Sequence, residues 1–375
     1  MKAELAMLLL LFPAVAFGAQ VYSDKELGTK ALEAVITNIK NEDSDIRAMA
    51  AEVLGNAGNK AAVKMLTGLL TDINKHVRIT AAEALWRLGN PSGLKTVYAI
   101  INDVPAKEPV NHSPLIELKT ISQNKIREHA IEAIVYMKGA KAEKLLFSLK
   151  NDAFGTVRDV AARELSSLGY NEEMTQFLDA LDSEDEAVRY QSAAVFSKIC
   201  NAAALPKLKE LLGKEVSIRV KTAVLDAIAC IPERKSAAQA LLLLADDKNP
   251  TVQYKAIVAL AGIKDKKVSA KLAEINSGTG DLKLKLAILP ALISRSADAA
   301  IGGQPADDAS VRPELETISR ALNALSPEVK ISAVKALENF NPQEARPLLG
   351  AALADANATV KLEAALQILR RFSKK

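Results

Sequence analysis

The sequence predicts an all-α protein, an α-solenoid of about ten stacked antiparallel helix pairs. One observation is a residue pattern that recurs along the chain at a spacing near 31 residues, which is typical of stacked supersecondary units. The other is composition. Aromatic residues make up only 4% of the 375 residues, and Gly and Pro number 17 and 14, whereas sheet-rich folds use more of these residues.

Composition and charge also exclude classes of function. With 49% hydrophobic residues the chain buries a large core and is not disordered. Lys and Arg number 49 against 45 Asp and Glu, a net charge of +4. That excess is far below what a protein needs when its affinity comes from neutralising phosphates, so we expect no nucleic-acid partner.

Residues 1–19 read as a secretory signal. A basic start at Lys2 precedes an apolar run from Leu5 to Phe17, and small residues follow at Gly18 and Ala19. The run is shorter than the roughly 20 residues that a membrane span needs, so a permanent anchor is the weaker interpretation, beside a buried N-terminal helix. We predict cleavage near Gly18 or Ala19, a single solenoid over 20–375 without a membrane span, and a periplasmic or extracellular location.

The repeat is defined by an apolar anchor, usually followed by a cation and then, after two further residues, by small residues. Successive anchors lie 30 to 34 residues apart, except for two longer steps. From each anchor, apolar or small residues recur at +4, +7, +8 and +11, which share one side of a helix. The ten anchors are Ile46, Val77, Ile126, Val157, Val188, Ile218, Val252, Leu282, Val329 and Val360.

A second amphipathic stretch precedes each anchor helix, so each period predicts one helix pair. Gly58, Gly89 and Gly169 fall at +12, where a left-handed residue ends a helix. One pair cannot bury its own apolar faces, so the pairs must stack into a continuous core. At the usual helix spacing the stack is a curve about 100 Å long.

The two longer steps predict inserted surface loops at 102–124 and 296–313. A tolerated insertion and a functional loop both remain open for each. Pro290 interrupts the eighth anchor helix, and we expect a helix there despite it.

The repeat resembles a known family. The segment Asp72 to Gly89, with its Val-Arg anchor, paired alanines and closing Gly, is similar to HEAT repeats of the short type found in phycobilin lyases. The resemblance covers residues 24–372 and implies an armadillo-like superhelix. It is specific for fold and weak for function, because this repeat serves many unrelated tasks.

Two enzyme families share the repeat and form the alternative hypothesis, a bilin lyase or a deoxyhypusine hydroxylase-like oxidoreductase. The hydroxylase uses His-Glu pairs to bind iron, and this chain contains no His-Glu dipeptide. His76, His112 and His129 are dispersed, and His129 reads as a surface residue. We therefore predict no catalytic residues, no metal and no cofactor.

Two further patterns have structural interpretations. Cations follow most anchors, and carboxylates five residues before several anchors are placed to pair with them, which favours a ladder that holds layers in register over a polyanion track. Cys200 and Cys230 lie at +12 in adjacent layers. Stacked helices place equivalent Cα atoms about 8–10 Å apart, too far for a disulfide, so we expect free thiols, with a bond as the alternative.

The predicted binding site lies on the inner, concave face at +2 and +6. Position +6 is acidic in the first three layers, where Glu52, Glu83 and Glu132 form an ordinary solvated face. In layers five to eight both positions turn apolar, beside a row of lysines at +3. The predicted protein-binding residues are Tyr190, Val220, Lys221, Val224, Tyr254, Lys255, Val258, Leu284, Lys285 and Ile288.

We expect this strip to bind a protein or peptide with an acidic or C-terminal segment. Tight curvature, coverage by the 296–313 loop, or self-association would remove the groove. The sequence therefore predicts an exported, non-enzymatic scaffold or adaptor whose partner and oligomeric state it does not specify.

Overall fold

The computed structural model describes residues 22–106, 114–301 and 313–372, and every regular element in those ranges is helical. The helices alternate between two sets, joined in places by short 3-10 turns. The first set is α1 (Asp24–Asn38), α3 (Val63–Leu69), α5 (Leu94–Ile101), α7 (Glu143–Leu149), α9 (Asn171–Ala180), α11 (Leu205–Lys214), α13 (Ala238–Leu244), α15 (Lys266–Gly278), α17 (Pro313–Leu322) and α19 (Pro342–Leu353).

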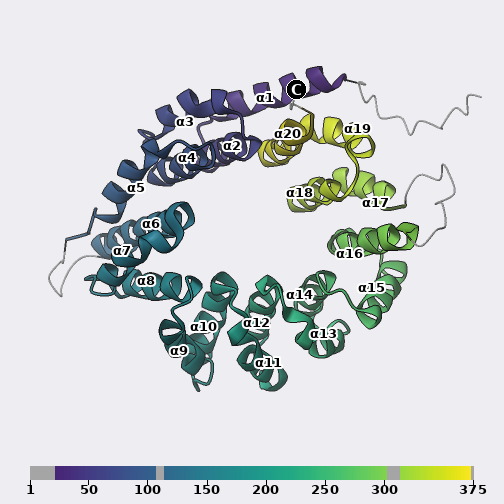
Figure 1. Cartoon of the computed structure of the whole chain (residues 1–375). Helices are drawn as coiled ribbons and strands as arrows, with labels where there is room; N and C mark the ends of the chain where they lie inside the picture. Colours follow the sequence, from purple (N-terminus) through teal and green to yellow (C-terminus); the bar gives the residue numbers. More distant parts are fainter. Residues whose placement is uncertain (1–21, 107–113, 302–312, 373–375) are drawn as a thin grey trace, which may run out of the picture.

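The second set carries the repeat anchors and lines the inside of the curve (Figure 1). Its members are α2 (Ser44–Ala57), α4 (Lys75–Arg87), α6 (Pro114–Lys138), α8 (Gly155–Ser167), α10 (Glu186–Ile199), α12 (Ile218–Cys230), α14 (Pro250–Ala261), α16 (Leu282–Ile301), α18 (Pro327–Ala336) and α20 (Ala358–Phe372).

Local sequence sets the ends of the inner helices. Asp43, Asn74, Asp185 and Asn249 cap four of them, each accepting a hydrogen bond from a backbone N–H in the first turn. Glycines follow the ends of α2, α4 and α8, as the repeat predicts. Gly58, Gly89 and Gly169 have φ angles of 74°, 79° and 99°, a conformation that glycine adopts at little steric cost.

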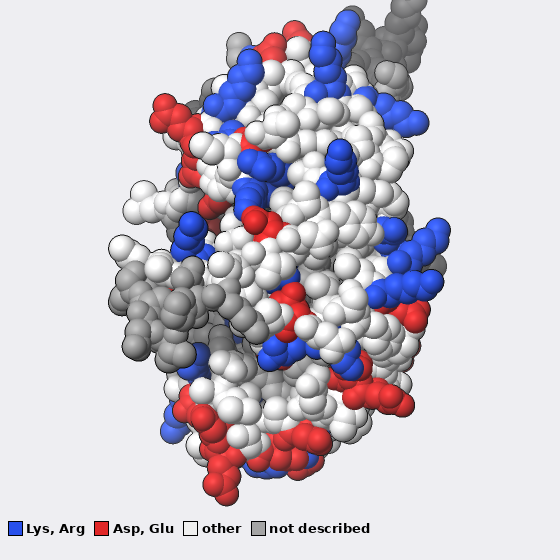
Figure 2. Space-filling view, turned by 90° about the vertical axis from the view of Figure 1, so that its left-hand side faces the viewer, with Lys and Arg blue, Asp and Glu red and all other residues white. Residues whose placement is uncertain are grey.

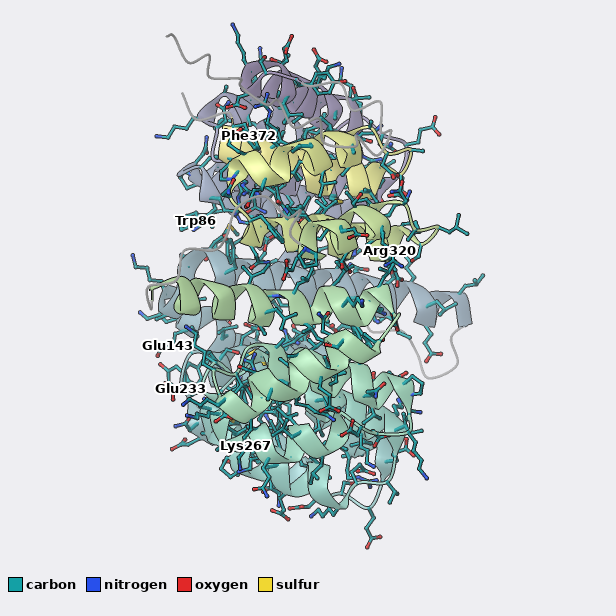
Figure 3. All side chains as sticks on the ribbon, turned by 90° about the vertical axis from the view of Figure 1, so that its right-hand side faces the viewer. Trp86, Glu143, Glu233, Lys267, Arg320 and Phe372 are labelled. Carbon is teal, nitrogen blue, oxygen red and sulfur yellow. A yellow bond between two sulfur atoms is a disulfide. The ribbon has the colours of Figure 1, made fainter. Side chains whose placement is uncertain are left out.

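The stack of layers closes into a ring, with α20 packed against both α1 and α2 (Figure 1). Seen from the side in Figure 3, the helices of successive layers lie as stacked rods. The sequence analysis predicted a curve and did not foresee the closure. The curvature of a solenoid comes from small rotations between layers, which the repeat pattern does not encode.

The closing seam is an apolar core. Leu27, Ala31 and Val35 of α1 have no exposed surface, and they share one hydrophobic cluster with Ala364 and Ile368 of α20. Polar contacts flank it. Arg346 lies 3.3 Å from the Asp24 carboxylate, and Arg370 Nε donates to the carbonyl of Asn56 at 3.2 Å. The two terminal layers thus cover each other's apolar faces.

The two predicted loops are shorter than expected, because part of each is helical. Helix α6 already begins at Pro114, so residues 114–124 of the predicted loop 102–124 are helical. Likewise α16 continues through Pro290 to Ile301, inside the predicted loop 296–313. Residues 107–113 and 302–312 lie outside the described residues, as does the predicted signal at 1–19. In the described part of the chain no helix is long and apolar enough to span a membrane.

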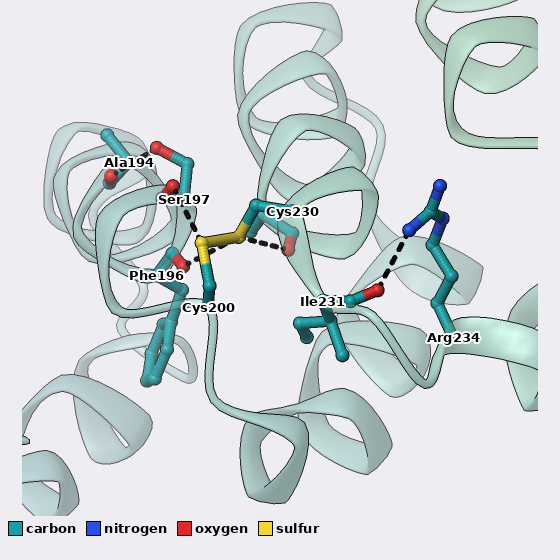
Figure 4. The surroundings of a disulfide bond; sticks show 8 residues. Ala194, Phe196, Ser197, Cys200, Cys230, Ile231 and Arg234 are labelled. Atoms are coloured by element: carbon teal, nitrogen blue, oxygen red, sulfur yellow. Dashed lines mark hydrogen bonds between the residues drawn. A yellow bond between two sulfur atoms is a disulfide. The ribbon is translucent and has the colours of Figure 1, made fainter. Parts of the chain in front are cut away.

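Cys200 and Cys230 form a disulfide between the ends of α10 and α12, so the expectation of free thiols was wrong (Figure 4). Their Cα atoms are 5.3 Å apart, closer than the spacing of helix axes suggested. The reason is local. Cys200 follows the last turn of α10 in a left-handed conformation, with φ of 52°, rather than on the body of the helix.

The seam can be tested by burying a charge in it. We expect Ala31→Arg to separate α1 from α20, because it places an unpaired guanidinium in an apolar core. Small-angle X-ray scattering should then report a larger radius of gyration, with helix content almost unchanged. The control is Glu33→Arg on the exposed side of the same helix, which should leave the scattering unchanged. An unchanged profile for Ala31→Arg would contradict a closure held by this core.

The disulfide can be tested by alkylation of the purified protein. We expect no labelled cysteine before reduction and two after it. For a sequence separation of 30 residues, chain entropy predicts that reduction lowers the free energy of unfolding by about 3.5 kcal/mol. Cys200→Ser and Cys230→Ser should each lower stability to the same extent as the double variant. Labelling of both thiols without reductant would contradict the bond.

Candidate binding surface on the inner wall of the ring

The capping residues fix the register of each inner helix and correct two of the predicted anchors. In α2, α4, α10 and α14 the anchor lies three residues after the cap. Ser217 and Asp281 lie three residues before Val220 and Leu284. Each accepts a hydrogen bond from the backbone N–H of that residue. The anchors of layers six and eight are therefore Val220 and Leu284, two residues later than predicted.

This shift removes four apolar residues from the predicted groove. Val220, Val224 and Ile288 have no exposed surface and belong to the core between layers, and Leu284 packs against the same cluster. In the corrected register these residues occupy positions 0 and +4, which belong to the apolar side of the helix. Val220, Val224 and Ile288 offer a partner no surface and Leu284 is only partly exposed, so the predicted apolar strip is interrupted in layers six and eight.

The other predicted residues lie in layers five and seven or are cations. Tyr190 is half-buried beneath the Arg219 guanidinium, 3.9 Å from the ring centroid, and Tyr254 lies beneath the Lys283 ammonium at 4.7 Å. Val258 is half-buried on α14. The two tyrosines therefore already make cation–π contacts within the protein.

The predicted lysine row divides in two. Lys255 binds the carboxylate of Asp226 on α12 at 2.6 Å, so an acidic partner would have to displace that carboxylate. Lys221 and Lys285 directly follow the corrected anchors and are half-buried, at the ladder position rather than in a row beside a groove. The expectation of an acidic partner for this row therefore loses its main support.

The predicted ladder of cations and carboxylates is present and joins neighbouring layers. Its members pair a cation after one anchor with a carboxylate 25 or 26 residues further on. The pairs are Arg47–Asp72 at 2.8 Å, Arg127–Asp152 at 2.5 Å, Arg189–Glu215 at 2.8 Å and Lys330–Asp355 at 2.7 Å. The hydrogen bond from Arg47 lowers the pKa of Asp72, and that from Arg189 lowers the pKa of Glu215.

The inner wall instead carries a run of carboxylates that crosses the closing seam. We call Glu363 of α20, Glu52 of α2, Glu83 of α4 and Glu132 of α6 the carboxylate arc. Their charges interact in sequence, since Glu52 acts on both Glu363 and Glu83, and Glu132 acts on Glu83. Only ring closure brings residue 363 beside residue 52.

The surroundings of Glu83 disfavour its ionised form, so it is not the ordinary solvated residue that was predicted. Its pKa is raised to about 7, mainly by burial; Arg87 opposes the increase, and the flanking Glu52 and Glu132 add to it. Burial likewise raises the pKa of Glu363, with Lys335 opposing the increase and Glu338 and Glu52 adding to it. The arc therefore holds less negative charge near neutral pH than its residue types suggest.

Glu132 ends the arc and joins three layers. Its carboxylate accepts from Arg163 of α8 at 2.5 Å and from Lys198 of α10 at 2.6 Å. Burial opposes its ionisation, but these two cations outweigh that effect and lower its pKa. The wall from α6 to α10 is thus internally neutralised, while the part from α20 to α4 retains the unbalanced carboxylates.

Two of the histidines that looked dispersed meet on the inner helices. His76 Nδ1 of α4 lies 2.9 Å from His129 Nδ1 of α6, and their rings stack with centroids 5.1 Å apart. His129 is half-buried, not the surface residue that was predicted, and burial and the charge of His76 lower its pKa. His112 lies outside the described residues. In the described segments, no three or more His, Cys, Asp or Glu side chains are arranged to hold a metal.

Comparison with known proteins agrees with the fold. A family model of HEAT repeats matches residues 31–109 and 144–229, so the chain contains HEAT repeats there. A search of curated proteins found no match.

Solved structures that align with this chain include human deoxyhypusine hydroxylase in complex with glycerol, at 20% identity and a TM-score of 0.27, covering 63% of this chain and 88% of that one. The CpcE–CpcF complex of phycocyanin lyase from Nostoc sp. PCC7120 is 16% identical with a TM-score of 0.32, covering 91% and 98%. Kap121p is 12% identical with a TM-score of 0.34, covering 86% and 38%. At TM-scores this low the alignments support no inference about this chain.

The raised pKa of Glu83 predicts that the stability of the protein depends on pH. Its folded pKa of about 7 exceeds the ordinary value of 4.5, so the folded state binds the proton more tightly than the unfolded state does. Stability therefore falls as the pH rises from about 4.5 to about 7, and the full loss remains above pH 7. We expect Glu83→Gln to raise the melting temperature at pH 8 by roughly 2–4 °C for each kcal/mol recovered, and to have a much smaller effect at pH 5. Glu33→Gln, on the exposed face of α1, is the control. An equal effect of Glu83→Gln at both pH values would contradict the assignment.

Proposed function

We propose that this protein is an exported, non-enzymatic scaffold that holds a protein or peptide partner against the inner wall of its ring. The export part is supported by the signal-like residues 1–19 and by the Cys200–Cys230 disulfide, because such bonds persist in oxidising compartments and are rare in the cytosol. Mass spectrometry of the mature N-terminus tests it, and we expect a chain that begins after Gly18 or Ala19.

The carboxylate arc carries the binding part of the proposal. Glu363, Glu52 and Glu83 are neighbouring like charges on a wall formed by three layers, and their mutual repulsion is relieved when a cation binds among them. A partner segment rich in Lys or Arg supplies such cations. The occupant that fits the wall is therefore a basic segment rather than the acidic one expected from the lysine row.

The charge of the outer surface does not favour a polyanion partner. Figure 2 shows one outer side of the ring, on which basic and acidic side chains are interspersed over a largely uncharged surface. The cations of the ladder are paired with carboxylates in four layers. These observations support a protein or peptide partner over nucleic acid.

Binding can be tested with fluorescein-labelled peptides and the mature chain. We expect a Lys-rich peptide to bind at the carboxylate arc, whereas any binding of a Glu-rich peptide of equal length should not depend on the arc. The triple variant Glu52→Gln, Glu83→Gln and Glu363→Gln should weaken binding of the Lys-rich peptide at least tenfold, because it removes the arc's charge.

The matched control changes the same number of charges on outer helices, with Glu33→Gln, Glu172→Gln and Glu316→Gln, all exposed. It should bind as the unmodified protein does. Equal loss in both triple variants would indicate a general charge effect and contradict the inner-wall site. Crosslinking in the native envelope would then identify the natural partner.

A further inference from the structure

The ladder of layer-joining ion pairs is incomplete at Arg78. In the four complete pairs the cation binds a carboxylate of the next layer, and the residue 25 positions after Arg78 is Asp103. That carboxylate binds Lys75 instead. Arg78 Nε donates to the backbone carbonyl of Asp72, and within the described ranges its guanidinium has no carboxylate partner. Arg78 therefore lacks the cross-layer ion pair that the cations of the four complete pairs make.

A cleft lies at this position, on the edge of the ring where α3 turns into α4. Its volume is about 530 Å³. The cleft is lined by both cations and apolar groups. The cations are Lys75, Arg78 and Lys95, and the apolar residues are Leu70, Ala99 and Ile100. Asp103 is the one carboxylate of the lining, so three cations and one anion leave a local charge of 3 − 1 = +2.

Two exposed aliphatic side chains flank the cleft. Ile73, in the turn just before Lys75, is 89% exposed, and Val104, directly after Asp103, is 47% exposed. The turn that carries Val104 is held in place, because Gln123 of α6 donates to the carbonyl of Asp103 at 2.8 Å. Exposed apolar groups beside a cationic cleft suit a ligand that combines carboxylates with aliphatic groups.

We propose that this cleft binds an acidic peptide segment, whose Asp or Glu side chain completes the ion pair at Arg78 and whose neighbouring aliphatic residues pack on Leu70, Ile73 and Val104. A carboxylate is the group that three arginines of the ladder bind, and Arg47 and Asp72 form two parallel hydrogen bonds of 2.8 and 2.9 Å. This site is separate from the carboxylate arc and attracts the opposite charge.

The test is fluorescence anisotropy of the mature chain with a fluorescein-labelled peptide of alternating Leu and Glu. We expect Arg78→Gln and Lys95→Gln each to weaken binding about tenfold, since each removes a cation from the cleft. Lys95 is exposed and makes no ion pair in the described part of the chain, so its replacement keeps the test valid if Arg78→Gln destabilises the layer.

Arg158→Gln is the matched control. Arg158 follows its anchor as Arg78 does and donates to the carbonyl of Asp152 at 2.8 Å, but it does not line the cleft. It should leave affinity unchanged, as should the triple variant of the carboxylate arc, which separates this site from the proposed inner-wall function. The proposal is overturned by an absence of binding to the unmodified protein at about 1 mM, by equal loss in Arg158→Gln, or by inorganic phosphate competing for the cleft more strongly than acetate does.

Discussion

The structure depends on one constraint, that a single helix pair cannot bury its own apolar faces. Inner layers meet it by stacking on two neighbours, whereas the terminal layers of a solenoid usually need polar caps. Here the first and last layers cover each other, with Leu27, Ala31 and Val35 sharing a core with Ala364 and Ile368. Each of these aliphatic burials is worth up to about 1.5–3 kcal/mol for the larger side chains, so closure removes the need for caps.

Closure also creates the inner wall. Residues more than 300 positions apart become neighbours, and Glu363 extends a run of carboxylates that would otherwise begin at Glu52. The unbalanced part of that wall lies next to the seam, while the wall from α6 to α10 is neutralised by Arg163 and Lys198. The candidate binding surface and the closing core therefore both rely on the packing of α20 against the first layer, α1 and α2.

The sequence predicted the layers and their ladder because both are local and periodic. The sequence-based prediction failed in layers six and eight, where it placed the anchor two residues too early. Ile218-Arg219 and Leu282-Lys283 imitate the anchor pattern, but Ser217 and Asp281 cap helices whose anchors are Val220 and Leu284. Counting three residues from each capping side chain would have corrected this. The disulfide and the His76–His129 pair depend on how helix ends and neighbouring layers approach, which the repeat spacing does not specify.

The most direct test of the closed ring is the distance between its first and last layers in solution. Spin labels placed at the exposed Lys25 of α1 and Gln343 of α19 report it, since the nearby Asp24 and Arg346 side chains lie 3.3 Å apart. The ring predicts a single narrow distribution at short distance. A broad distribution reaching towards the roughly 100 Å of an open stack would contradict it.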